Sequence, residues 1–146
     1  MQANHGITRI LAALGAIPFI ACAFLPYLGF NELPYLGDTG NIAAAYGLTI
    51  ASFMAGVHWG TALNAEVNLP VNLFITSNVV AVAAWLSFLL VSLSQALALL
   101  AILFAYLLYI DFRLHRAGLI GQAYWNTRLS ITGIVIVCLT IIARGG

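Results

Sequence analysis

The stretch that decides the fold reads Tyr46-Gly-Leu-Thr-Ile-Ala-Ser-Phe-Met-Ala-Gly-Val-His58-Trp59-Gly-Thr-Ala-Leu63. It contains no Asp, Glu, Lys or Arg, and an apolar segment of this length is typical of a transmembrane helix. The remaining sequence has the same character, since 63% of the 146 residues are hydrophobic and 6% are charged. Water-soluble domains carry about 25% charged residues, so this composition indicates an integral membrane protein.

The length of the chain sets the number of membrane spans. A hydrocarbon core about 30 Å thick is crossed by roughly 20 apolar residues in helical conformation. The apolar runs predict five spans, at residues 8–28, 41–63, 71–91, 95–112 and 126–143. The predicted fold is an all-α integral membrane bundle of five transmembrane helices, which form a single transmembrane domain over residues 1–146.

The distribution of arginine predicts how the bundle is inserted. The side with the N-terminus and the loop between the fourth and fifth spans has Arg9, Arg113, Arg116 and Arg128, whereas the opposite side has only Arg144. Cytoplasmic segments carry the excess of basic residues. We therefore expect the N-terminus in the cytoplasm and the C-terminus outside.

Composition also excludes several classes of function. The net charge of +1 and the absence of a basic run argue against a nucleic-acid partner. The chain has no lysine, so no cofactor is held as a lysine Schiff base. His5 and His115 lie outside the predicted spans, which argues against a haem held by two histidines. No metal-binding or catalytic motif appears at a usable spacing, so we expect neither a metal site nor catalytic residues, and an enzyme is the less favoured class.

Polar residues gather in the cytoplasmic half of the predicted bundle. Because ionisable groups in a membrane normally pair with one another or face a cavity, this half is the candidate functional region. Asp111 and Arg128 are the obvious ion pair, and His58 lies about 7–8 Å from the inner end of its helix at 1.5 Å per residue. The candidate cluster comprises His58, Trp59, Asn78, Asp111, Tyr124, Trp125 and Arg128.

Purely structural roles are open for the same side chains. His58 could bond Asn78 or a backbone carbonyl, and Asp111 could bond His115 or Arg113 instead of Arg128. The tryptophans and Tyr124 could belong to the aromatic belt at the membrane interface.

One face of the second span carries small residues. At 100° per residue, Ser52, Gly56 and Gly60 form a stripe that points nearly opposite to His58. Such stripes let helices approach closely, so we predict that this face packs against another helix.

Two segments resemble a small family of five-span membrane proteins of unknown function. They read Ser52-Phe-Met-Ala-Gly-Val-His58-Trp-Gly60 and Tyr124-Trp-Asn-Thr-Arg128-Leu-Ser-Ile-Thr132. The resemblance departs mildly from the family pattern, which has two adjacent glycines before the histidine and a proline before the fifth span. Its members are bacterial inner-membrane proteins, with a mitochondrial transmembrane relative in animals. The resemblance therefore implies a bacterial inner-membrane location and, by analogy, an energy-converting membrane.

Three functions follow as expectations. The first is a non-enzymatic accessory or assembly subunit of a membrane complex, which binds a membrane-protein partner or a second copy through its small-residue face. The second is a homo-oligomeric channel or proton pathway lined by His58 and Asp111. The third is binding of a lipid or quinone in a pocket at the cytoplasmic side. Apart from such a bound molecule, the sequence predicts no cofactor, and the lipid bilayer is its constant partner.

Overall fold

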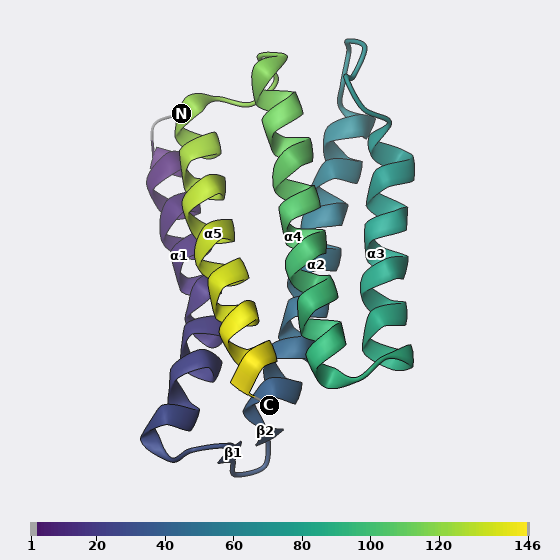
Figure 1. Ribbon diagram of the computed structural model, residues 1–146. Helices are drawn as coiled ribbons and strands as arrows, with labels where there is room; N and C mark the ends of the chain where they lie inside the picture. Colours follow the sequence, from purple (N-terminus) through teal and green to yellow (C-terminus); the bar gives the residue numbers. More distant parts are fainter. Residues whose placement is uncertain (1–2, 146) are drawn as a thin grey trace.

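The computed structural model describes residues 3–145, and within them five long α-helices form one bundle (Figure 1). Each helix is long and apolar enough to cross a membrane. The helices are α1 (Ala3–Phe24), α2 (Thr39–Leu63), α3 (Leu73–Leu90), α4 (Leu93–Arg116) and α5 (Gln122–Gly145). The all-α, five-helix prediction is confirmed, and the chain is a multi-pass membrane protein. Its direction of insertion stays a prediction.

Several helices differ in extent from the predicted spans. The first span, residues 8–28, divides into α1 and a short 3₁₀ helix, Leu25–Leu28, with Pro26 near its start. α4 continues past residue 112 because Arg113, His115 and Arg116 interact favourably with its C-terminal dipole. α3 begins later than predicted because Asn72 caps it, accepting a hydrogen bond from the Ile75 amide at 3.2 Å. The helix ends thus follow local capping as well as hydropathy.

The α1–α2 connection folds into a small hairpin that the sequence patterns did not indicate. Strands β1 (Glu32–Leu33) and β2 (Gly37–Asp38) pair in antiparallel register, and Gly37 has the positive φ that the tight turn requires. Asp38 then caps α2, accepting a hydrogen bond from the Asn41 amide at 3.0 Å. This side chain fixes the direction in which α2 leaves the hairpin.

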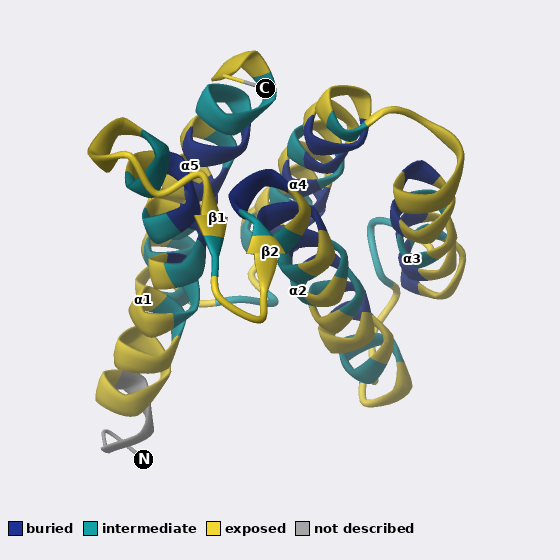
Figure 2. Cartoon of the chain, turned by 90° about the horizontal axis from the view of Figure 1, so that it is seen from below, coloured by how far each residue is buried: buried dark blue, intermediate teal, exposed yellow. Residues whose placement is uncertain are grey.

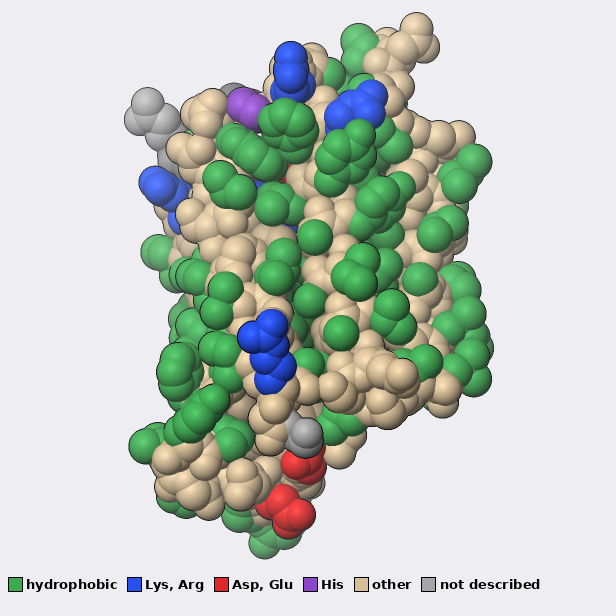
Figure 3. All heavy atoms as spheres, in the orientation of Figure 1, with side chains coloured by type: hydrophobic (Ala, Val, Ile, Leu, Met, Phe, Trp, Pro, Cys, Tyr) green, Lys and Arg blue, Asp and Glu red, His purple; other side chains and the backbone are tan. Residues whose placement is uncertain are grey.

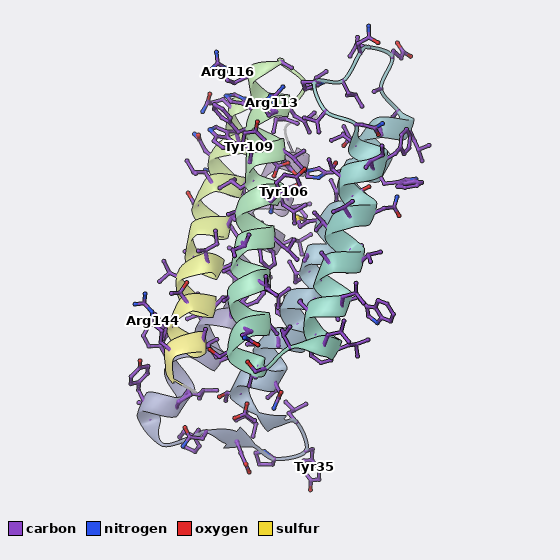
Figure 4. All side chains as sticks on the ribbon, turned by 45° about the vertical axis from the view of Figure 1, so that its right-hand side comes forward. Tyr35, Tyr106, Tyr109, Arg113, Arg116 and Arg144 are labelled. Carbon is purple, nitrogen blue, oxygen red and sulfur yellow. The ribbon has the colours of Figure 1, made fainter. Side chains whose placement is uncertain are left out.

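The two ends of the bundle differ in charge. We call the end that carries Arg113 and Arg116 the basic end, and the end that carries the hairpin, with Glu32 and Asp38, the acidic end. Figure 4 places Arg113 and Arg116 at one end and Tyr35 of the hairpin at the other. Between the ends, hydrophobic side chains cover much of the face in Figure 3, as a lipid-facing surface requires.

Each helix of the bundle packs against at least two others. α1 lies beside α5, α4 lies beside both α5 and α2, and α3 lies at the outer edge against α2 and α4 (Figures 1 and 2). Phe19 of α1 is fully buried at the centre, with its ring 5.0 Å from that of Tyr46 and 6.0 Å from that of Phe104. The α2 side of the core is made of small residues, Ala43, Ala44, Ala51 and Ala55. Helix approach therefore depends on the small size of the α2 side chains.

Two glycines of α2 give a matched test of this packing. A Cβ atom built on Gly47 would lie 3.0 Å from Leu100 and 3.6 Å from Phe19, whereas nothing lies within 4 Å of one built on Gly56. We expect Gly47→Leu to destabilise the bundle by about 1–3 kcal/mol through overpacking, and Gly56→Leu to leave stability unchanged. Thermal unfolding of the purified chain in mild detergent measures both. Equal melting temperatures for the two variants would contradict the close α1–α2–α4 contact.

Candidate functional site

Topology brings three ionisable residues to one level of the bundle. His58 and Asp111 each lie five residues before the end of their helix, and Arg128 lies six residues after the start of α5. At 1.5 Å per residue these positions are about 7–9 Å inside the basic end. α2, α4 and α5 all have a terminus at this end, so the three side chains share one depth.

The three residues form a continuous hydrogen-bonded cluster, which we call the His–Asp–Arg cluster. His58 Nε2 lies 2.8 Å from Asp111 Oδ1, and Arg128 Nε lies 2.7 Å from Asp111 Oδ2. His58 and Asp111 are each 2% exposed. Arginine is always a donor, so the carboxylate accepts from Arg128 on one oxygen and from the His58 N–H on the other. The cluster joins three helices and leaves neither carboxylate oxygen unpaired.

The alternative hydrogen-bond partners that the sequence offered for His58 and Asp111 are bonded to other groups. Asn78 donates to the Phe74 carbonyl one turn back at 2.7 Å, so it does not bond His58. Arg113 donates to the Tyr109 hydroxyl at 2.9 Å and to the Pro70 carbonyl at 3.3 Å. His115 Nδ1 lies 3.0 Å from the Ile120 carbonyl. None of these side chains bonds Asp111, so Asp111 is shared by His58 and Arg128.

Two further residues of the predicted cluster lie apart from it, and one lies beside it. Trp59 is 40% exposed and packs edge-on against Phe74, with ring centroids 5.0 Å apart. Trp125 stacks on His115 in nearly parallel planes at 5.7 Å. Tyr124 is half-buried and lines two cavities that flank the His–Asp–Arg cluster. The cluster therefore has four of the seven predicted side chains at or beside it: His58, Asp111, Arg128 and Tyr124.

The first cavity, of about 320 Å³, lies between α1, α2, α4 and α5. Its walls are mostly apolar, and they include Phe19, Met54 and Phe104. Arg128 and Thr132, one turn apart on α5, are among its few polar lining residues. Arg128 Nη2 and Thr132 Oγ1 are both buried and have no hydrogen-bond partner among the described residues. Burying such groups unpaired is costly, so a water or another molecule would be needed to pair them.

The second cavity, of about 280 Å³, lies on the other side of the cluster. It is lined by Val57, His58, Thr61, Asp111, Leu114, Ile120, Gly121 and Tyr124. His58 Nδ1 is buried without a partner among the described residues. Since Nε2 donates to Asp111, Nδ1 is the ring nitrogen of His58 that is not used within the cluster. The second cavity is therefore lined by a histidine with one unused ring nitrogen.

The small-residue stripe does not face another helix of this chain. Ser52 is half-buried, and no described atom lies within 4 Å of a Cβ built on Gly56 or Gly60. Packing through Ser52, Gly56 and Gly60 stays a prediction, and it concerns a second molecule.

The fold and the cluster together define the class: a small helical multi-pass membrane protein with a buried His–Asp–Arg cluster between two cavities. Residues 5–143 match a family described as Protein of unknown function (DUF3429), and the chain belongs to that family. Membership of an uncharacterised family is therefore confirmed, whereas the bacterial and mitochondrial relationships stay predictions. Neither the curated proteins nor the solved structures gave a match.

Sequence reasoning missed Thr132 and the contribution of α1 to the site. Thr132 lies four residues after Arg128, and this spacing places both side chains on one face of α5. That spacing was a usable signal. The α1 residues Thr8, Arg9 and Gly15 line the cavity only because α1 packs beside α5, and no local pattern indicates that neighbour.

The pairing of charges in the His–Asp–Arg cluster predicts how a substitution of Asp111 changes the stability of the bundle. Asp111→Asn leaves Arg128 buried without its counter-ion, and breaking such a pair costs about 3–5 kcal/mol. We expect a clear loss of thermal stability in detergent, partly restored in Asp111→Asn with Arg128→Gln because that pair carries no charge. Glu66→Gln, which changes an exposed loop carboxylate, is the control. A melting temperature of Asp111→Asn equal to that of the control would show that the cluster does not contribute to stability.

Proposed function

We propose that this protein binds an amphipathic molecule of the membrane, a lipid or a quinone, in the first cavity. The observation that carries the proposal is the pair of buried, unpartnered polar atoms, Arg128 Nη2 and Thr132 Oγ1, beside a predominantly apolar cavity. Of the functions that the sequence suggested, ligand binding uses this feature most directly.

The size and position of the cavity suit such a ligand. Its volume of about 320 Å³ lies at the lower end of the range for small-molecule sites, roughly 300–1,000 Å³. Its lining runs along α5 from Ala123 to Val135, a length of about 18 Å at 1.5 Å per residue. Leu11 and Phe53, which also line it, are 62% and 64% exposed, so the cavity opens toward the lipid-facing surface. A ligand could therefore enter from the bilayer.

The polar groups divide the cavity into two chemical regions. Thr8, Arg9, Tyr124, Thr127 and Arg128 lie toward the basic end, and Phe19, Phe104 and Val135 lie deeper. A molecule with a polar head and an apolar tail matches this order, with its head near the interface and its tail in the hydrocarbon.

The burial of His58 and Asp111 inside the bundle argues against the oligomeric channel. His58 and Asp111 are each 2% exposed within a single chain, between α2, α4 and α5. Residues that line a pore on an oligomer axis face outward from each subunit. A pathway through this cluster would instead run inside one chain.

An accessory or assembly role is the second candidate. The favouring observation is the open face at Gly56 and Gly60, where nothing lies within 4 Å of an added Cβ. This face would let a helix of a membrane-protein partner, or of a second copy, approach closely. This face lies next to the first cavity, because Phe53, three residues before Gly56 on α2, lines that cavity. A bacterial inner-membrane location remains part of this proposal.

Ligand binding is tested by filling the cavity. Ala12 lines it, whereas Ala13, the next residue of α1, is exposed and does not. We expect native mass spectrometry of the wild-type chain, released gently from its host membrane, to show a retained lipid or quinone. Ala12→Trp should lose this molecule because the indole occupies its space, and Ala13→Trp should keep it. A wild-type chain without a bound molecule, or equal retention in both variants, would reject the proposal.

The accessory role is tested on the open face of α2. If a partner helix packs there, Gly56→Leu blocks its approach while the bundle itself stays folded. We expect co-purification of a membrane-protein partner, or of a second copy, from gently solubilised membranes, and its loss in Gly56→Leu. Ile10→Ala, at a position on α1 that is 62% exposed, is the control. A wild-type chain that migrates alone would count against this candidate.

A further inference from the structure

We infer that the polar end of the bound molecule is an anion, a carboxylate or a phosphate, held by Arg9 and Arg128 with Thr132 beside them. This inference rests on the proposed function, and it specifies the chemical class of the ligand for the same cavity.

The charge of the cavity lining is the first observation. Arg9 and Arg128 both line the first cavity, and none of its lining residues is a carboxylate. α1 and α5 both run from the basic end toward the acidic end, and each arginine lies six residues after the described start of its helix. The two arginines therefore lie at a similar depth, about 9 Å from the helix starts, with Arg9 exposed at the edge of the cavity.

The pairing of Arg128 is the second observation. Arginine often meets a carboxylate through two parallel N–H groups. Here one carboxylate oxygen of Asp111 accepts a hydrogen bond from His58 at 2.8 Å. The other oxygen accepts a hydrogen bond from Nε of Arg128 at 2.7 Å, so Arg128 uses a single nitrogen for this pair. Nη2 of Arg128 remains buried without a partner among the described residues. Asp111 and His58 thus hold the guanidinium in place while one nitrogen stays available for a ligand.

The third observation concerns charge balance. Asp111 offsets Arg128, so Arg9 remains the additional positive charge beside the cavity. This additional positive charge stabilises an anion in a medium of low dielectric constant. Hydrogen bonds between an arginine and an anion are also stronger than hydrogen bonds between neutral groups. Thr132 Oγ1, 1% exposed and unpartnered in the described chain, adds a neutral donor one turn deeper. A quinone carbonyl would use the donors but would gain nothing from the second cation.

The test compares three molecules that share one apolar chain. Hexadecanoate carries a carboxylate, hexadecyl phosphate carries a phosphate, and hexadecanol is uncharged. Each is added to the full chain in a neutral detergent, and binding is followed by native mass spectrometry. We expect at least one of the anions to bind roughly tenfold or more tightly than hexadecanol, the factor that one net charged hydrogen bond supplies. Which anion is preferred distinguishes a fatty acid from a phospholipid source.

Two variants assign the preference to this cavity. Arg9→Gln should reduce the discrimination between anion and alcohol several-fold, because one cation is removed while the apolar contacts remain. Arg116→Gln is the matched control, since Arg116 lies at the same end of the bundle, contacts Phe112 and is not among the residues that line the cavity. Thr132→Val removes the deeper hydroxyl at constant shape and should weaken anion binding without affecting the alcohol. Neither Arg9→Gln nor Thr132→Val disturbs the Asp111–Arg128 pair.

The outcomes separate this inference from the proposed function. Equal binding of all three molecules, lost in Ala12→Trp, would overturn the anion and leave ligand binding intact. An anion preference that is unchanged in both Arg9→Gln and Thr132→Val would place the anion elsewhere and also overturn the inference. Binding of none of the three, with no molecule retained from the host membrane, would overturn the proposed function itself.

Discussion

The structure depends on the burial of one carboxylate. Asp111 lies buried on an apolar helix inside the bundle, and an unpaired charge costs about 2.5–3.5 kcal/mol at the centre of a membrane helix on insertion scales. Only the approach of α2 and α5 supplies the two donors that satisfy it, from His58 and Arg128. The carboxylate therefore fixes the level and rotation of three helices against one another. Apolar packing alone sets these weakly, because lipid solvates hydrocarbon side chains as well as the protein interior does.

The sequence was informative about depth and less so about rotation. Span length and turn positions follow from hydropathy, so His58, Asp111 and Arg128 could be placed at one level. Which way each helix turns is decided by neighbours far apart in the chain. Asn78 and Trp59 lie at the same level but outside the cluster. Asn78 is exposed because α3 lies at the edge of the bundle, and Trp59 packs against Phe74 of α3. The contribution of α1 to the cavity was invisible for the same reason.

The site combines the hydrogen-bonded His–Asp–Arg cluster with two cavities that flank it. Asp111 is fully paired, whereas each of its two donors keeps one buried nitrogen without a partner in the described chain. These atoms are Nδ1 of His58, a residue that lines the second cavity, and Nη2 of Arg128, a residue that lines the first. A cluster built only to neutralise charge would have no need of two flanking cavities. Tyr124, which lines both, is the side chain that the two spaces share.

The unequal ends of the bundle have a consequence in an energised membrane. Glu32 and Asp38 lie in the strands of the hairpin, and Arg113 and Arg116 lie at the other end of the bundle, where Figure 4 labels them. A potential of 100 mV is worth about 2.3 kcal/mol for each elementary charge that crosses it. If the arginines lie on the negative side of the membrane, as their distribution predicts, these two sets of charges lie where the field favours them. The membrane potential would then oppose inversion of the folded protein.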